Sequence, residues 1–154
     1  MTGRQFRDLF ASAAKEAGWV KSAGGWVFPR LAGDQCATSI DLQQASHEKK
    51  MYCNIGVHVD GVYGRRFGES WQPEETHPHV FRREPKDLSQ FLDFATAIDD
   101  DQRSKGLQSL FSFLSSFATR ARTRTGLFDL EKDGLVFILP PIRSELDQMK
   151  LHEI

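Results

Sequence analysis

Two neighbouring segments of alternating apolar and polar residues constrain the fold more than any other feature of the chain. The clearer segment puts Met51, Cys53, Ile55, Val57 and Val59 on one side and Tyr52, Asn54, Gly56, His58 and Asp60 on the other. Residues 37–46 alternate similarly, with Thr38, Ile40, Leu42 and Gln44 expected to be buried, and Ala37, Ser39, Asp41 and Gln43 opposite. The pattern is typical of an antiparallel sheet packed on one face, because a parallel sheet covered on both faces shows continuous apolar runs.

Two longer segments carry apolar residues at helical spacing. Residues 2–17 predict an amphipathic helix with Thr2 as its N-cap and Gly18 as the residue that ends it. The stretch from Gln102 to near Gly126 predicts the strongest helix, whose buried stripe is Leu107, Leu110, Phe111, Leu114, Phe117, Ala118 and Ala121. Shorter helices are predicted at 85–98 and, after two prolines, at 142–152.

The remaining segments complete a single domain. Residues 19–31 predict two short strands around a glycine turn, and the apolar run 135–139 predicts either a strand or an extended core segment. A chain of 154 residues has room for one ordinary domain, so residues 1–154 are expected to share one core. The predicted fold is α+β: an N-terminal helix, an antiparallel sheet of four to five strands, and C-terminal helices packed on one face.

Charge and cysteine content disfavour several classes of protein. Lysine plus arginine number 20 and aspartate plus glutamate 21, so the basic excess that duplex binding requires is missing, and nucleic acid is not an expected partner. The two cysteines, Cys36 and Cys53, are too few for a cysteine zinc site and are expected to be reduced and packed. No apolar run reaches about 18 residues, and the N-terminal residues lack the apolar stretch of a secretion signal. We therefore expect a cytoplasmic protein without a membrane span.

Four residues form a candidate catalytic or ligand-binding set. His58 and Asp60 lie two apart in a predicted strand, where a carboxylate can orient an imidazole for acid or base chemistry. His77 and His79 follow two glutamates in a proline-rich stretch, and their spacing suits two metal ligands if the chain is extended. No clear third ligand follows, so no metal is predicted. The alternative interpretation is a surface histidine beside a surface aspartate, with solvated histidines in the loop.

A second set of residues suits contact with a protein partner. Residues 61–87 form the longest irregular region, and the chain contains 12 Phe and 3 Trp residues. Aromatic residues and arginine are enriched in protein interfaces, and Tyr52, Tyr63, Arg66 and Trp71 are the candidates. The alternative is that these side chains only cover the sheet.

Two charged clusters have structural explanations that we prefer. Arg120, Arg122 and Arg124 would face one way only in an extended segment, where they could bind an acidic group. At a helix end they would instead be solvated cations that complement the helix dipole. The triple acid 99–101 lacks the pattern of a calcium loop, so one of these aspartates is expected to act as an N-cap.

Four short motifs follow the predicted N-terminal helix in order: Gly18-Trp19-Val20-Lys21, Gly25-Trp26-Val27-Phe28-Pro29-Arg30, Ile40-Asp41-Leu42-Gln43-Gln44 and Asn54-Ile55-Gly56-Val57. With these motifs, roughly residues 6–72 resemble a bacterial family of domains of unknown function, DUF4304. The resemblance implies no catalytic residues. Small bacterial domains of this kind are sometimes immunity or accessory proteins that accompany toxins.

The sequence shows no nucleophile elbow and no phosphate loop, so we predict no catalytic residue and no cofactor. The leading hypothesis is a non-enzymatic cytoplasmic protein-binding domain of unknown specific role, of which an immunity-type inhibitor of a bacterial toxin is one form. It would use the free sheet face and the loop from Gly61 to Pro85. The alternative is a small enzyme or ligand-binding protein in which His58, Asp60, His77 and His79 converge on a pocket.

Overall fold

The computed structural model describes residues 1–68 and 71–152, and its first element is the predicted N-terminal helix. Helix α1 spans Gly3–Glu16, and the Thr2 hydroxyl accepts a hydrogen bond from the Gln5 backbone while the Gln5 side chain accepts one from the Thr2 backbone. This reciprocal pair satisfies two backbone N–H groups that the first helical turn leaves unpaired. Gly18 follows with φ of 85°, so the predicted cap at each end of this helix is confirmed.

Within the described residues, the sheet is antiparallel throughout and has five strands in chain order, β1-β2-β3-β4-β5. Strands β1 (Val20–Lys21) and β2 (Trp26–Val27) form the short hairpin predicted around the glycine turn. The long strands β3 (Cys36–Gln44) and β4 (Met51–Val59) pair over their whole length, with Cys36 opposite Val59 and Gln44 opposite Met51. Strand β5 (Val80–Arg83) pairs with β4. The prediction of an α+β fold with an antiparallel sheet is confirmed.

The strongest predicted helix is divided into two. Helix α2 spans Asp100–Arg120, with Asp99 as the predicted aspartate N-cap, and helix α3 spans Arg124–Lys132. The prediction of one helix ending near Gly126 is therefore wrong. Two backbone N–H groups at the start of β3, from Gln35 and Cys36, donate to the Arg122 carbonyl and hold the junction in a non-helical conformation.

Three short 3-10 segments and one last helix complete the architecture. The 3-10 segments are η1 (Val62–Gly64), η2 (Pro73–Glu75) and η3 (Lys86–Leu92), and helix α4 spans Pro140–His152. Segment η3 replaces the α-helix predicted at 85–98. The carbonyls of Phe91, Asp93 and Thr96 all accept from the side chain of Arg103, and these bonds take the place of helical ones.

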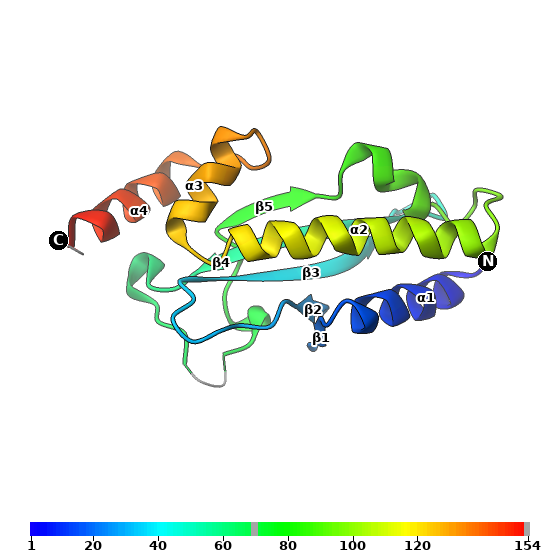
Figure 1. Ribbon diagram of the computed structural model, residues 1–154, viewed down its shortest axis with the longest axis horizontal. Coiled ribbons are helices and arrows are strands. Elements are labelled where there is room, and N and C mark those ends of the chain that lie inside the picture. The colour runs from blue at the N-terminus through cyan, green and yellow to red at the C-terminus, as the bar shows by residue number, and fades with distance from the viewer. Residues whose placement is uncertain (69–70, 153–154) are drawn as a thin grey trace.

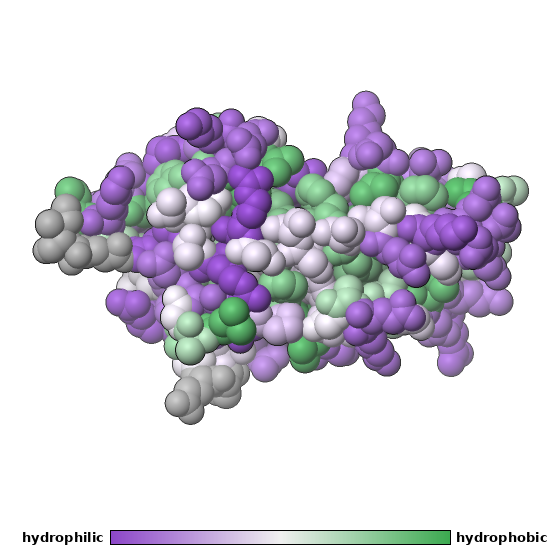
Figure 2. All heavy atoms as spheres, in the orientation of Figure 1, coloured by the Kyte–Doolittle hydropathy of each residue, from purple (hydrophilic) through white to green (hydrophobic). Residues whose placement is uncertain are grey.

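Helices α1 and α2 lie side by side across one face of the sheet (Figure 1). The core between them combines the predicted stripe of α2 with Phe6 and Phe10 of α1 and the odd-numbered residues of β4, all of them buried. Cys36 and Cys53 are free and buried on this side, as predicted. In the view of Figure 2, this side of the molecule shows apolar residues in small groups among hydrophilic ones.

The apolar run 135–139 fills the core without belonging to a described strand. Val136 and Ile138 are buried, whereas Phe137 and Leu139 are more than half exposed. The burial alternates as in a strand because one side of the segment packs against the core. Among the described residues, no helix is long and apolar enough to cross a membrane.

Candidate functional site

The face of the sheet opposite α1 and α2 is partly covered by the described residues 61–68 and 71–79, which we call the covering loop. Trp71 is its anchor: the indole is 8% exposed, stacks on Phe67 at 4.3 Å and meets the His58 ring edge-on at 5.1 Å. Pro78 lies directly on Gly56, where a Cβ atom would come within 2.6 Å of the proline ring. The glycine therefore allows the loop to contact the strand. The predicted free sheet face is free over only part of its area.

His58 lies beneath this loop with both ring nitrogens hydrogen-bonded. Its side chain is buried, Nε2 lies 2.9 Å from Ser39 Oγ, and Nδ1 lies 3.0 Å from Thr76 Oγ1. Burial lowers the His58 pKa to about 4, and the neighbouring His79 acts in the same direction. At neutral pH the imidazole is therefore uncharged, with one nitrogen donating and the other accepting.

In the structure His77 and His79 lie near His58, whereas the Asp60 side chain binds the backbone of the covering loop. Both histidines are close enough to His58 to influence its charge. His79 is half-buried, which lowers its pKa, and its Nδ1 accepts a hydrogen bond of 2.8 Å from the Val59 backbone. The Asp60 carboxylate accepts a hydrogen bond of 2.9 Å from the Phe67 backbone, so it fastens the covering loop.

A cavity of about 200 Å³ opens between the covering loop and the glycine turn of the β1–β2 hairpin. Its lining includes Ser39, Asp41, His58, Thr76 and His77. On the loop side, the Glu74 carboxylate accepts a 3.2 Å hydrogen bond from the Gly24 backbone. Backbone N–H groups, first that of Glu74 itself and then others including that of Gly24, lower the pKa of this carboxyl. We call this space the His58 cavity.

The His58 cavity has no metal-binding geometry. Among residues 1–68 and 71–152, no three histidine, cysteine, aspartate or glutamate side chains are placed to hold one ion. His79 Nδ1 is already occupied by the Val59 N–H. The cavity is suited instead to a small polar molecule, because hydroxyl, imidazole and carboxylate groups all reach it.

Beyond the covering loop, the sheet presents what we call the uncovered sheet face. It consists of the exposed residues Asp41, Gln43, Phe81 and Arg83, the half-buried Tyr52, and Asn54, which is buried among them. The register of the three strands puts these residues on one side. Phe81 is 55% exposed. The Arg83 guanidinium lies 4.0 Å from the centre of the Tyr52 ring, and Lys50 Nζ lies 5.2 Å from it.

The four residues predicted for partner binding do not share one surface. Tyr52 lies near the start of β4, whereas Tyr63 and Arg66 follow its end, which separates them by about 20 Å along the strand direction. Tyr63 is 59% exposed, and the Arg66 guanidinium packs over Gly61. Trp71 is buried, so it fits the alternative that it covers the sheet. Sequence reasoning missed Phe81 and Arg83, because an aromatic residue in a short strand gives no sign of which face it occupies.

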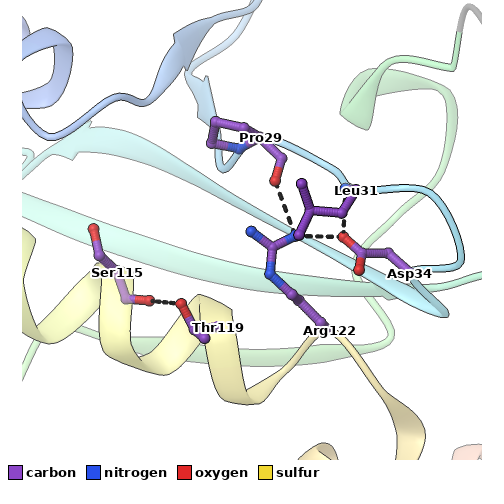
Figure 3. A network of polar contacts seen from close by, with 6 residues as sticks. All are labelled: Pro29, Leu31, Asp34, Ser115, Thr119 and Arg122. Carbon is purple, nitrogen blue, oxygen red and sulfur yellow. Dashed lines mark hydrogen bonds and ion pairs between the residues drawn. The ribbon is translucent and has the colours of Figure 1, made fainter.

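The arginines at the α2–α3 junction have structural partners. Arg120 pairs with Asp133, while Arg122 pairs with Asp34 and donates to the Pro29 carbonyl (Figure 3). The backbone N–H of Arg124 donates to the Gln35 side chain. The contacts of Arg122 and Arg124 fasten the junction to the segment that leads into β3, whereas the Arg120–Asp133 pair joins the ends of α2 and α3.

A scan of family models and searches of curated proteins and of solved structures gave no significant match to this chain. The resemblance to DUF4304 therefore stays a prediction.

The buried neutral state of His58 predicts a loss of stability in acid. The pKa is about 6.5 in the unfolded chain and about 4 in the folded protein, so the unfolded state binds the proton first as pH falls. The stability that depends on neutral His58 is fully present above about pH 6.5, and it is lost as the pH falls toward 4. Between pH 7 and 4.5 we expect His58 alone to cost about 2 kcal/mol.

Urea unfolding at these two pH values measures this loss. The His58→Gln variant retains hydrogen-bonding capacity without a titrating group. In this variant, the difference in unfolding free energy between pH 7 and pH 4.5 should be smaller than in wild type by about 2 kcal/mol. The exposed His47→Gln should leave it unchanged. An equal pH response in wild type and His58→Gln would show that His58 does not carry this effect.

Proposed function

We propose that this chain is a cytoplasmic protein-binding domain whose partner docks on the uncovered sheet face. The observation that carries the proposal is the exposure of Phe81, 55%, on the same face as Tyr52 with its stacked Arg83. Aromatic residues and arginine dominate the energetic centres of protein interfaces. A sheet presents them on a rigid backbone, which reduces the entropy lost on binding.

Hydrogen bonds hold the polar side chains of this face in fixed positions. The Asn54 side-chain amide donates to Gln43 Oε1 at 3.1 Å and to Asp41 Oδ2 at 3.4 Å, so three side chains on β3 and β4 hold one another. A partner would meet an ordered surface. Ordered polar groups around an aromatic centre match the usual division of an interface into core and rim.

The charges of the region favour a partner with acidic groups at the rim of the contact. Arg83 and Lys50 both lie over the Tyr52 ring, and neither is in an ion pair within the described part of the chain. A carboxylate from a partner could reach the exposed Arg83 guanidinium without displacing an existing acidic group.

Capture experiments with matched variants test this proposal. The full chain, immobilised, is exposed to lysate of the source cell, and the captured protein is then titrated against wild type and variants. We expect Phe81→Ala and Arg83→Ala each to weaken binding by about tenfold or more, as truncation of central interface residues does.

Phe137→Ala is the control, because Phe137 is 68% exposed and lies outside the uncovered sheet face. Its affinity should equal that of wild type. Equal affinities for wild type, Phe81→Ala and Arg83→Ala would rule out this face as the docking site. That this protein-binding domain is an immunity-type inhibitor of a bacterial toxin stays a prediction.

A further inference from the structure

From the sequence alone, no serine or cysteine nucleophile could be assigned to His58. The strand register places a serine, Ser39, beside it. Ser39 of β3 is opposite Gly56 of β4, and His58 lies two residues farther along β4. Their side chains therefore meet diagonally across the two strands, with Ser39 Oγ 2.9 Å from His58 Nε2. This is the separation expected of a nucleophile and its general base.

A third group orients the imidazole. Thr76 Oγ1 lies 3.0 Å from His58 Nδ1 and comes from the covering loop. When Nδ1–H donates to this oxygen, the lone pair of Nε2 is directed at the Ser39 hydroxyl. The three hydrogen-bonded side chains of Thr76, His58 and Ser39 are thus arranged as a positioning group, a general base and a nucleophile.

We propose that Ser39 is the nucleophile of a hydrolytic site for small acyl esters, with His58 as its general base and Thr76 as a positioning residue. The His58 cavity adjoins the uncovered sheet face at Asp41, but this activity does not depend on protein binding there. It rests on the His58 cavity and on the three hydrogen-bonded side chains.

The cavity provides space for a substrate beside the serine. Ser39 and His58 both line it, and its volume of about 200 Å³ suits an acyl group of a few carbons. Gly25 lines the cavity and lies so close to β3 that a Cβ atom there would come within 2.0 Å of the Ile40 carbonyl oxygen. Ser39 is partly exposed while His58 is buried, so substrate and water reach the base from the side of the Ser39 hydroxyl.

The reaction balances with water as the only second reactant. Ser39 Oγ forms a bond to the ester carbonyl carbon while its proton passes to His58 Nε2. The carbon–oxygen bond to the alcohol then breaks, and the departing oxygen keeps the electron pair and takes the proton from Nε2. Water attacks the acyl-serine, again giving a proton to Nε2, and Ser39 Oγ leaves and recovers it. The products are one acid and one alcohol.

The charged groups near His58 determine how the base behaves. Burial is the main influence that disfavours the imidazolium formed during each step, and His79 and His77 act in the same direction, whereas Glu74 and a hydrogen bond to the Thr76 backbone favour it. Asp41 also lines the cavity, from β3. The base is in its neutral, proton-accepting form throughout the neutral pH range, and its low basicity implies slow turnover and a preference for activated esters.

Labelling of the full-length protein with an alkyl fluorophosphonate, read by intact mass, tests the nucleophile. We expect one adduct on wild type, formed as Ser39 Oγ bonds to phosphorus and fluoride leaves. Ser39→Ala should form none, and the exposed Ser46→Ala should react like wild type. No adduct on wild type, or equal labelling of Ser39→Ala, would overturn the proposal.

The positioning role of Thr76 has its own readout. Thr76→Ser keeps the hydroxyl and should label at a rate within about twofold of wild type, whereas Thr76→Val should lose at least tenfold. The wild-type rate should be constant between about pH 5.5 and 8, because His58 is neutral over this range. An inflection near pH 6.5, or equal rates for the Val and Ser variants, would contradict these roles. Phe81→Ala should label normally, so failure of one proposal is distinguishable from failure of the other.

Discussion

Replacing Arg103 with alanine is expected to destabilise the protein by about 4 kcal/mol, the largest effect we predict for one substitution. Arg103 is 1% exposed and lies on the buried side of α2. Its guanidinium donates to the carbonyls of Phe91, Asp93 and Thr96 at 2.9, 3.0 and 3.1 Å. Alanine would leave these carbonyls without their donor and would open a cavity beneath η3.

Urea unfolding at pH 7 measures this effect, with two further variants as controls. Lys105→Ala removes a cation from the exposed side of the same helix, where the pair with Asp101 is largely solvated, and should change stability by less than about 0.5 kcal/mol. Arg103→Lys keeps the charge but cannot reach three carbonyls in a planar arrangement, so it should recover only part of the loss. A loss below about 1 kcal/mol for Arg103→Ala would mean that the 86–98 segment does not depend on this side chain.

Replacing Trp71 with alanine is expected to cost about 3 kcal/mol and to release the covering loop from the sheet. The indole contacts Phe67, His58 and the Arg30 guanidinium, whose carbon lies 5.7 Å from the ring centroid. Its removal exposes His58 to water. Because burial is the main cause of the low His58 pKa, that pKa should rise from about 4 toward its usual value near 6.5.

Proton NMR of the His58 ring reports this pKa directly, and hydrogen exchange of residues 71–79 reports release of the loop. Trp71→Phe keeps an aromatic ring and should preserve most of the protection and the low pKa. Unchanged exchange and an unchanged His58 pKa in Trp71→Ala would show that the indole does not anchor the loop.

Much of the fold could be predicted because its signals are local. Alternation in β4 identified both the strand and its buried side, and the spacing of Leu107, Leu110, Phe111 and Leu114 identified the buried side of α2. The division between α2 and α3 could not be predicted, because it depends on Gln35 and Cys36 binding a carbonyl that is distant in sequence. The 3-10 geometry of η3 likewise depends on Arg103.

The candidate sites depended on contacts between distant segments. The pairing of Ser39 with His58 requires the register of β3 against β4, and the turn at 47–50 gives no residue signal that determines it. The sequence predicted Trp71 as an exposed residue that contacts a partner. In the structure it is buried against the sheet, because Gly56 allows Pro78 and the covering loop to approach β4 closely. Phe81 can be assigned to the uncovered sheet face only from its pairing with Gly56 across β4 and β5.

The role of the uncovered sheet face in partner binding is tested most directly by photo-crosslinking in the source cell. A benzophenone amino acid is placed at position 81 and, as the control, at position 137, and the intact cells are irradiated. We predict one abundant cross-linked protein from position 81 that is absent from position 137 and is lost when Arg83→Ala is added. The same products from both positions, or no product from position 81, would contradict the assignment of this face as a binding surface.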